Sequence, residues 1–354
     1  MMLRRLSRTL FSRLWPGTAA RRRRGGYSRA RGAVTHVIIL DGTMSTLNDG
    51  DETNAGLTYR LLAERGGTDL SLYYEAGLQW RTWRNSWDVI VGKGINRQIR
   101  RAYGYLASRY RPGDRIFLFG YSRGAYAVRS LAGVIDSVGL LKASNATERN
   151  VELAYRHYRY GTNAAAAFRK ANCHPDAVVE MIGVWDTVKA LGVRLPLVWK
   201  LTEKSHKFHH HQLSRCVKAG FHALALQENR AAYEPVMWVS DPSWSGRLEQ
   251  VWFAGTHGDV GGQLGGDTAS RPLSNIPLVW MLSQAELCGL ALPQGWRARF
   301  PTDPNAPSIG TWRGLGKIFL YRSRRVVGAD PSERLHETAI ARGLHMSYPA
   351  GHTA

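Results

Sequence analysis

A glycine-bounded turn, Gly-Tyr-Ser-Arg-Gly at residues 120–124, separates two apolar segments of different periodicity. Residues 115–119 read as a buried strand, and residues 125–136 carry apolar side chains at helical spacing. The glycines allow a strained strand-to-helix turn without a Cβ clash, and such a turn lifts the central side chain out of the sheet. The pattern therefore predicts a strand, a sharp turn and a helix, with Ser122 as a candidate nucleophile.

The rest of the chain alternates between strand-like and helix-like segments. Further strands are expected at residues 34–40, 70–74, 178–184 and 251–253, and further helices at 53–63, 94–110 and 276–290. Strands that alternate with helices form a parallel sheet covered by helices on both faces. The sequence therefore predicts an α/β fold of the α/β-hydrolase kind, with a mostly parallel sheet and helices on both faces.

Two polar residues follow predicted strands and complete a candidate catalytic triad with Ser122. Asp186 comes just after the strand at residues 178–184, and His257 follows the strand at 251–253. The carboxyl ends of parallel strands share one edge of the sheet, where active sites of such folds lie. We expect His257 to accept the proton of Ser122 and Asp186 to orient the imidazole.

Other residues could take these roles. Asp259 lies two positions from His257 and is the alternative acid, although it could also be a turn carboxylate that binds local backbone. His336 is an alternative base, but its neighbours are typical of an ordinary exposed helix. Asp186 and His257 are the preferred pair.

The loop after the first strand is expected to help bind an oxyanion. In hydrolases with this turn, one donor is the backbone amide after the nucleophile, here Arg123, and another comes from an early loop. Gly42 and Thr43 are the candidates in that loop. The Asp-Gly-Thr string at 41–43 also occurs in haloacid-dehalogenase phosphatases, but their nucleophilic aspartate would have to stand where this chain has Ile39.

Basic residues are spread unevenly along the 354 residues, which carry a net charge of +21. Residues 1–31 hold ten arginines and no carboxylate, and Leu3, Leu6 and Leu10 follow helical spacing. We expect three parts: residues 1–33 as a basic segment, amphipathic or disordered, residues 34–345 as the hydrolase-like domain, and residues 346–354 as a tail.

The positive charge points to anionic partners. A basic amphipathic helix within residues 1–24 would make peripheral contact with an anionic membrane surface. A different class of function is a catalytically silent hydrolase fold that binds nucleic acid or anionic membrane through its basic surface. The sequence contains no nucleic-acid recognition motif, so we expect no specific nucleic-acid partner. No run of about 18 apolar residues indicates a membrane-spanning helix.

Metal and disulfide chemistry are not expected. The three cysteines are far apart and form no Cys-x-x-Cys pair. The histidines at 209–211 are consecutive, so their side chains point apart, and a solvated loop is the better interpretation. His222 lies in an apolar run and is expected to be a hydrogen-bonded core residue. We therefore expect neither a metal ion nor an organic cofactor.

Several segments resemble one known family in the same order along the chain. They include Asp-Gly-Thr at 41–43, Phe-Gly-Tyr-Ser-Arg-Gly-Ala at 119–125, Gly-Val-Trp-Asp-Thr-Val at 183–188 and Gly-Thr-His-Gly-Asp-Val-Gly-Gly at 255–262. Shorter matches lie at 53–54, 110–114, 139–141, 222–226 and 280–282. Together they resemble the α/β-hydrolase domain of type VI secretion phospholipase effectors, first lipase-effector class, and of its bacterial relatives.

The resemblance implies a Ser-Asp-His hydrolase that cleaves glycerophospholipid esters through an acyl-enzyme. The sequence differs from the family pattern at Gln227, where family members usually have an acidic residue. We also expect no counterpart of the large extra region with which secreted effectors of the family approach membranes. We expect a cytoplasmic or peripheral membrane enzyme, or a secreted effector, and the sequence leaves the oligomeric state open.

Overall fold

The computed structural model describes residues 31–77, 93–188, 212–312 and 320–345. Residues from Ala33 onward cluster into one compact unit. The expected amphipathic segment at 1–24, the tail at 346–354 and the histidines at 209–211 lie outside the described residues. The three-part division of the chain therefore stays a prediction. In the described residues, no helix is long and apolar enough to cross a membrane.

A seven-stranded sheet forms the centre of the fold, in the order β2-β1-β3-β4-β5-β6-β7. Every pair of neighbouring strands is parallel. This confirms the predicted α/β class. The strands are β1 (Thr35–Leu40), β2 (Leu70–Glu75), β3 (Arg115–Tyr121), β4 (Val179–Trp185), β5 (Val217–Ala225), β6 (Arg247–Phe253) and β7 (Glu333–Leu335).

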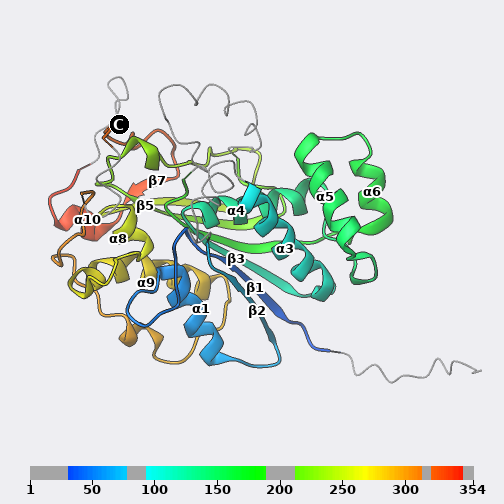
Figure 1. Cartoon of the computed structure of the whole chain (residues 1–354), viewed down its shortest axis with the longest axis horizontal. Coiled ribbons are helices and arrows are strands. Elements are labelled where there is room, and N and C mark those ends of the chain that lie inside the picture. Colours follow the sequence, from blue (N-terminus) through cyan, green and yellow to red (C-terminus); the bar gives the residue numbers. More distant parts are fainter. Residues whose placement is uncertain (1–30, 78–92, 189–211, 313–319, 346–354) are drawn as a thin grey trace, which may run out of the picture. The chain divides into compact units, whose positions relative to one another are not determined.

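Helices cover both faces of this sheet (Figure 1). One face packs against α3 (Lys93–Arg109) and α4 (Arg123–Ser137), with α5 (Glu148–Tyr160) packed on these two helices, and the other face packs against α1 (Asn54–Arg65), α8 (His257–Gly261) and α9 (Arg271–Leu287). The remaining helices are α6 (Ala165–Asn172) and α10 (Glu337–Ala341), with short 3-10 turns at Ala143–Asn145, Ala231–Tyr233, Thr268–Ser270 and Trp296–Arg299.

The strands are apolar on both sides because both sides are covered. Along β1, Ile38 and Leu40 belong to the core cluster under α3 and α4, whereas Val37 and Ile39 belong to the cluster under α1 and α9. All four are fully buried. Burial of each side chain of this size contributes roughly 1.5–3 kcal/mol, so the layered core fixes where each strand ends.

His222 on β5 is a core histidine, as its apolar surroundings predict. Its side chain is fully buried, and its Nε2 atom accepts a hydrogen bond from the Thr187 amide at 3.1 Å. Burial, assisted by the positive charge of Arg129, lowers the pKa of His222 to about 3. A neutral imidazole therefore holds the backbone directly after Asp186.

Candidate active site

Ser122 occupies the turn between β3 and α4 and has a strained backbone, with φ 56° and ψ −118°. The flanking glycines are required by close backbone contacts. A Cβ on Gly120 would lie 2.6 Å from the Gly124 carbonyl oxygen, and a Cβ on Gly124 would overlap the Leu40 carbonyl oxygen. Strain of this kind costs on the order of 1–3 kcal/mol and persists where the surrounding structure fixes it.

The structure brings the predicted serine, histidine and aspartate into one hydrogen-bonded line. The Nε2 atom of His257 lies 2.9 Å from Ser122 Oγ, and its Nδ1 atom lies 2.5 Å from Asp186 Oδ2. The three residues follow β3, β4 and β6, which end at the same edge of the sheet. Ser122 keeps 6% and His257 4% of its surface exposed, so the line is almost dry.

Asp186 is held as a carboxylate. Burial alone would raise the pKa of Asp186, but the positive charge of Arg325 and the hydrogen bond from His257 outweigh it, and the pKa lies well below its ordinary value. The Ala225 amide donates to Asp186 Oδ1 at 3.0 Å. The backbone of Asp186 has φ 39°, a second strained position beside the serine.

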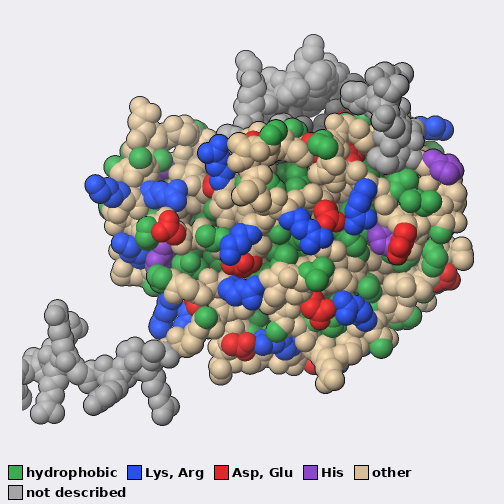
Figure 2. All heavy atoms as spheres, turned by 180° about the vertical axis from the view of Figure 1, so that it is seen from behind, with side chains coloured by type: hydrophobic (Ala, Val, Ile, Leu, Met, Phe, Trp, Pro, Cys, Tyr) green, Lys and Arg blue, Asp and Glu red, His purple; other side chains and the backbone are tan. Residues whose placement is uncertain are grey.

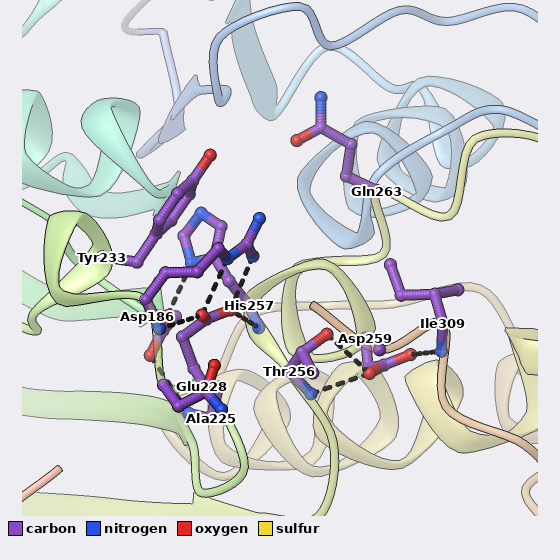
Figure 3. Close-up of polar contacts among 12 residues, drawn as sticks. Asp186, Ala225, Glu228, Tyr233, Thr256, His257, Asp259, Gln263 and Ile309 are labelled. Atoms are coloured by element: carbon purple, nitrogen blue, oxygen red, sulfur yellow. Dashed lines mark hydrogen bonds and ion pairs between the residues drawn. The ribbon is translucent and has the colours of Figure 1, made fainter. Parts of the chain in front are cut away.

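Asp259, the alternative acid, has other partners. Its Oδ2 atom accepts hydrogen bonds from the amide and the hydroxyl of Thr256, at 2.7 and 2.8 Å, and from the Ser308 hydroxyl at 2.5 Å. Its Oδ1 atom accepts from the Ile309 amide at 3.0 Å. Figure 3 shows this group apart from the Asp186–His257 contact. Asp259 therefore caps α8 and anchors the chain around Ile309.

We expect Asp259→Asn to lower the free energy of unfolding by about 1–3 kcal/mol, because an amide cannot accept all of these hydrogen bonds. Turnover of a soluble ester should remain close to that of the wild type. Urea unfolding and initial rates would be measured together, with Asp303→Asn at an exposed carboxylate as the control. Loss of turnover at unchanged stability would instead make Asp259 a catalytic acid.

His336 is not on an exposed helix, contrary to the sequence-based interpretation. It is the N-cap of α10, and its side chain accepts a hydrogen bond from the Thr338 amide at 3.3 Å. Its ring stacks on Phe253, with the centroids 4.6 Å apart, and burial lowers the pKa of His336. These contacts give it a capping role at the end of β7.

The three amides expected to bind an oxyanion differ in their availability. The Gly42 amide donates to the carboxylate of Asp41 at 2.6 Å, so it is already engaged. The structure gives the amides of Thr43 and Arg123 no acceptor among the described residues. The carbonyl of Thr43 accepts a hydrogen bond from the Gln263 side chain at 3.0 Å, which holds the loop in place. Among the described residues, the amides of Thr43 and Arg123 thus have no acceptor of their own, and Gly77 packs against the Thr43 amide, where a Cβ would lie 2.6 Å from its nitrogen.

Asp41 organises this loop from within the core. It is almost fully buried and accepts hydrogen bonds from the hydroxyls of Thr53 at 2.7 Å and Tyr74 at 2.8 Å. Burial raises the pKa of Asp41 to about 6, although these hydrogen bonds oppose the shift. The acidic residue thus pins the turn that carries Thr43.

An ion pair between Glu228 and Arg230 holds the backbone amide of His257. Glu228 pairs with Arg230 at 2.6 Å and accepts a hydrogen bond from the His257 amide at 3.2 Å. The rings of Tyr121 and Tyr233 lie 4.9 and 4.8 Å from the imidazole of His257. The imidazole is therefore packed between two tyrosine rings, and its backbone amide is held by Glu228.

One protein family matches most of the chain. Residues 35–284 match the family described as type VI secretion system phospholipase effector, Tle1-like, catalytic domain. The chain belongs to this Tle1-like family. The chain spans about a third to a half of the length of the relatives that it matches. In this Tle1-like domain the amide oxygen of Gln227 accepts a hydrogen bond from the Gly255 amide at 2.8 Å, so the usual acidic residue is replaced by another acceptor.

Individual relatives of the Tle1-like domain are distant. An uncharacterized protein of Saccharomyces cerevisiae is 25% identical over 254 residues, which span 64% of this chain and 36% of the yeast protein. A crystal structure of an uncharacterized protein from Pseudomonas aeruginosa is 16% identical, with a TM-score of 0.42, over 78% of this chain and 50% of that one. The Tle1 effector bound to the VgrG spike of the type 6 secretion system is 16% identical, with a TM-score of 0.34, over 66% and 51%.

Proposed function

We propose that this chain is a serine hydrolase that cleaves the carboxylic ester bonds of glycerophospholipids. The observation that carries the proposal is the line from Ser122 through His257 to Asp186, at the sheet edge where hydrolases of this kind work. Family membership supplies the substrate class. The reaction needs no group beyond the protein and water.

In the proposed reaction, Ser122 Oγ attacks the ester carbonyl carbon as His257 Nε2 takes its proton. The carbonyl oxygen becomes negative and is stabilised by the amides of Thr43 and Arg123. The tetrahedral species collapses, the bond to the alkoxy oxygen breaks, and His257 returns the proton to the leaving alcohol. Water then attacks the acyl-serine by the same route and releases the fatty acid.

Asp186 supports this proton transfer in the proposal. Its Oδ2 atom accepts the Nδ1–H of His257 and so keeps Nε2 as the free base toward Ser122. The carboxylate also stabilises the imidazolium that forms when the proton is taken. Burial is opposed by the charge of Arg325 and by the hydrogen bond from His257, which lower the pKa of Asp186 and favour its ionised form.

A basic side chain beside the nucleophile suits a phosphate-bearing substrate. The structure gives the Arg123 guanidinium no carboxylate partner among the described residues, and its charge interacts with the ring hydroxyl of Tyr233, which flanks His257. Burial lowers the pKa of Arg123 to about 10, so it remains charged at neutral pH. A planar guanidinium binds phosphate oxygens in a fork, so we propose that it binds the phosphate of the lipid.

The test is a comparison of two substrates. We expect Arg123→Gln to raise KM for phosphatidylglycerol in mixed micelles by roughly 10-fold or more, because a charge-assisted hydrogen bond is lost. KM for a short neutral ester should change far less, since the backbone amide of residue 123 remains. Products would be identified by mass spectrometry, with Arg149→Gln on the exposed face of α5 as the charge-matched control.

Three outcomes decide between the parts of this proposal. Release of fatty acid and lysophospholipid by the wild type supports the phospholipase activity. An equal effect of Arg123→Gln on both substrates would remove the phosphate contact. Turnover of the short ester without any attack on phospholipid would leave an esterase of another substrate class.

The charge distribution gives the silent binding protein less support. On the face shown in Figure 2, lysine and arginine side chains are interspersed with aspartate and glutamate rather than gathered into one patch. A catalytically silent fold also has no need of a serine held 2.9 Å from a buried imidazole. Membrane contact through residues 1–24 stays a prediction, since that segment lies outside the described residues.

A further inference from the structure

A buried arginine from the C-terminal part of the chain holds the acid of the Ser122–His257–Asp186 line. The guanidinium of Arg325 lies 2.5 Å from Asp186 Oδ1 through Nη1 and 2.9 Å from Asp186 Oδ2 through Nη2. Its side chain keeps only 4% of its surface exposed. No sequence motif marks this residue, which lies on an irregular segment before β7.

The same guanidinium also binds two backbone carbonyls around the site. It donates to the carbonyl oxygen of Ala225 at 2.8 Å and to that of Tyr233 at 2.6 Å. Ala225 ends β5, and Tyr233 carries one of the rings against His257. Arg325 thus joins the carboxylate of Asp186 to the end of β5 and to the segment over the imidazole.

These contacts remove the freedom of the carboxylate to rotate. Asp186 Oδ1 binds Arg325 and the Ala225 amide, and Oδ2 binds Arg325 and His257. A bidentate guanidinium–carboxylate pair fixes both oxygens in one plane, which a single amide donor cannot do. The backbone of Asp186 is itself strained, with φ 39°, so its conformation depends on restraint by the surrounding structure.

We propose that Arg325 is a positioning residue for the reaction, fixing Asp186 so that its Oδ2 atom stays aligned with His257. The proposal rests on the function proposed above. The competing explanation is that Arg325 only stabilises the fold, and the free-energy cost of burying its charge disfavours this explanation. Burying an ion pair is no more stabilising than apolar packing of the same volume, so stability alone gives no reason to retain one beside the reacting groups.

The charges around Asp186 show what the loss of Arg325 would do. His257 and Arg325 contact the carboxylate, and His222 and Tyr121 are the other ionisable groups buried near it. Without Arg325, burial would be opposed chiefly by the His257 contact, and the pKa of Asp186 would rise. A group whose pKa rises becomes protonated at higher pH, so activity would be lost earlier on the acid side.

The experiment measures kcat, KM and the pH profile for a soluble ester in full-length Arg325→Gln and Arg325→Lys. We expect Arg325→Gln to lower kcat by roughly 100-fold, the loss that a misplacement of about 1 Å can cause, with little change in KM. The acid limb of its pH profile, where kcat falls as the pH is lowered, should move to higher pH. Arg325→Lys keeps the charge but not the fork, so its kcat should be intermediate and its acid limb close to that of the wild type.

Arg115→Gln is the matched control. Arg115 donates to the carbonyls of Gly289 and Cys288 from the start of β3, at the opposite edge of the sheet from Ser122. It should keep the wild-type kcat and pH profile whatever happens to its melting temperature. A fall in kcat that follows the melting temperature equally in all three variants would make Arg325 purely structural.

Each remaining outcome is also decisive. A wild-type kcat and profile in either Arg325 variant would overturn the proposal. If Arg325→Gln does not fold, Arg325→Lys decides, and Arg325→Ala assayed with added methylguanidinium gives a second reading, since restored kcat requires only the cation in place. If Ser122→Ala is inactive and Arg325→Gln is fully active, only the inference about Arg325 is contradicted. If Ser122→Ala is active, the proposed function on which this inference rests is contradicted.

Discussion

Ser122→Ala is expected to lower kcat for ester hydrolysis by roughly 10⁶-fold, the scale seen when a serine hydrolase loses its nucleophile. The substitution removes only the Oγ atom, whose hydrogen bond runs to His257, and it retains the Cβ that already fits the strained turn. The free energy of unfolding should therefore change by less than about 1 kcal/mol. Initial rates and urea unfolding would be measured on the same preparations.

Ser137→Ala is the natural control for this prediction. Ser137 lies at the far end of α4, is solvent-accessible and donates only to the carbonyl of Gly133. It should hydrolyse esters at the wild-type rate. A fluorophosphonate probe should label the wild type and the control but not Ser122→Ala. Wild-type turnover by Ser122→Ala would show that another group attacks the ester.

Asp186→Asn should lower kcat by about 10⁴-fold, because the amide can donate to Nδ1 and so stabilise the wrong imidazole tautomer. The same change breaks the ion pair with Arg325 and leaves that guanidinium buried without a counter-charge. We therefore expect a loss of stability as well. The rate of phosphonylation of Ser122 by a fluorophosphonate, in which the serine oxygen bonds to phosphorus and fluoride leaves, reports proton removal from Ser122 and would separate the kinetic effect from the loss of folded protein.

The Asn variants of the two aspartates give opposite patterns if the proposal holds. Asp186→Asn should abolish most turnover, whereas Asp259→Asn should mainly reduce stability. The distinction follows from geometry, since Asp186 Oδ2 contacts the imidazole and Asp259 contacts Thr256, Ser308 and Ile309. Reversed patterns would make Asp259 the acid of the site.

Much of this arrangement could be predicted from the sequence because strand ends are visible there. An apolar run followed by a polar turn marks the end of a parallel strand, and residues at such ends must share one edge of the sheet. Ser122, Asp186 and His257 each follow a run of this kind. Their positions could thus be predicted together without knowing any distance.

Other features were not accessible to the same reasoning. The segment that forms β5 contains the polar His222, which hides its strand pattern, and β7 is only three residues long. Arg325 lies in a segment without helical or strand periodicity, and its proposed role depends on a tertiary contact with Asp186, which is distant in the sequence. The Gly42 amide looked like an oxyanion donor, but a one-residue contact with Asp41 engages it. The local sequence does not reveal whether the Gly42 amide will bind the Asp41 carboxylate or a substrate oxyanion.

The missing side chain of Gly124 also has a consequence for how this site could change. Any Cβ there would overlap the carbonyl oxygens of Leu40 and Asp41, so main chain meets main chain between the serine turn and the loop after β1. The spacing of nucleophile and loop is consequently set without help from variable side chains. Surrounding residues can therefore be exchanged to suit a different substrate while the candidate reacting atoms keep their separation, which makes the site a favourable starting point for altered selectivity.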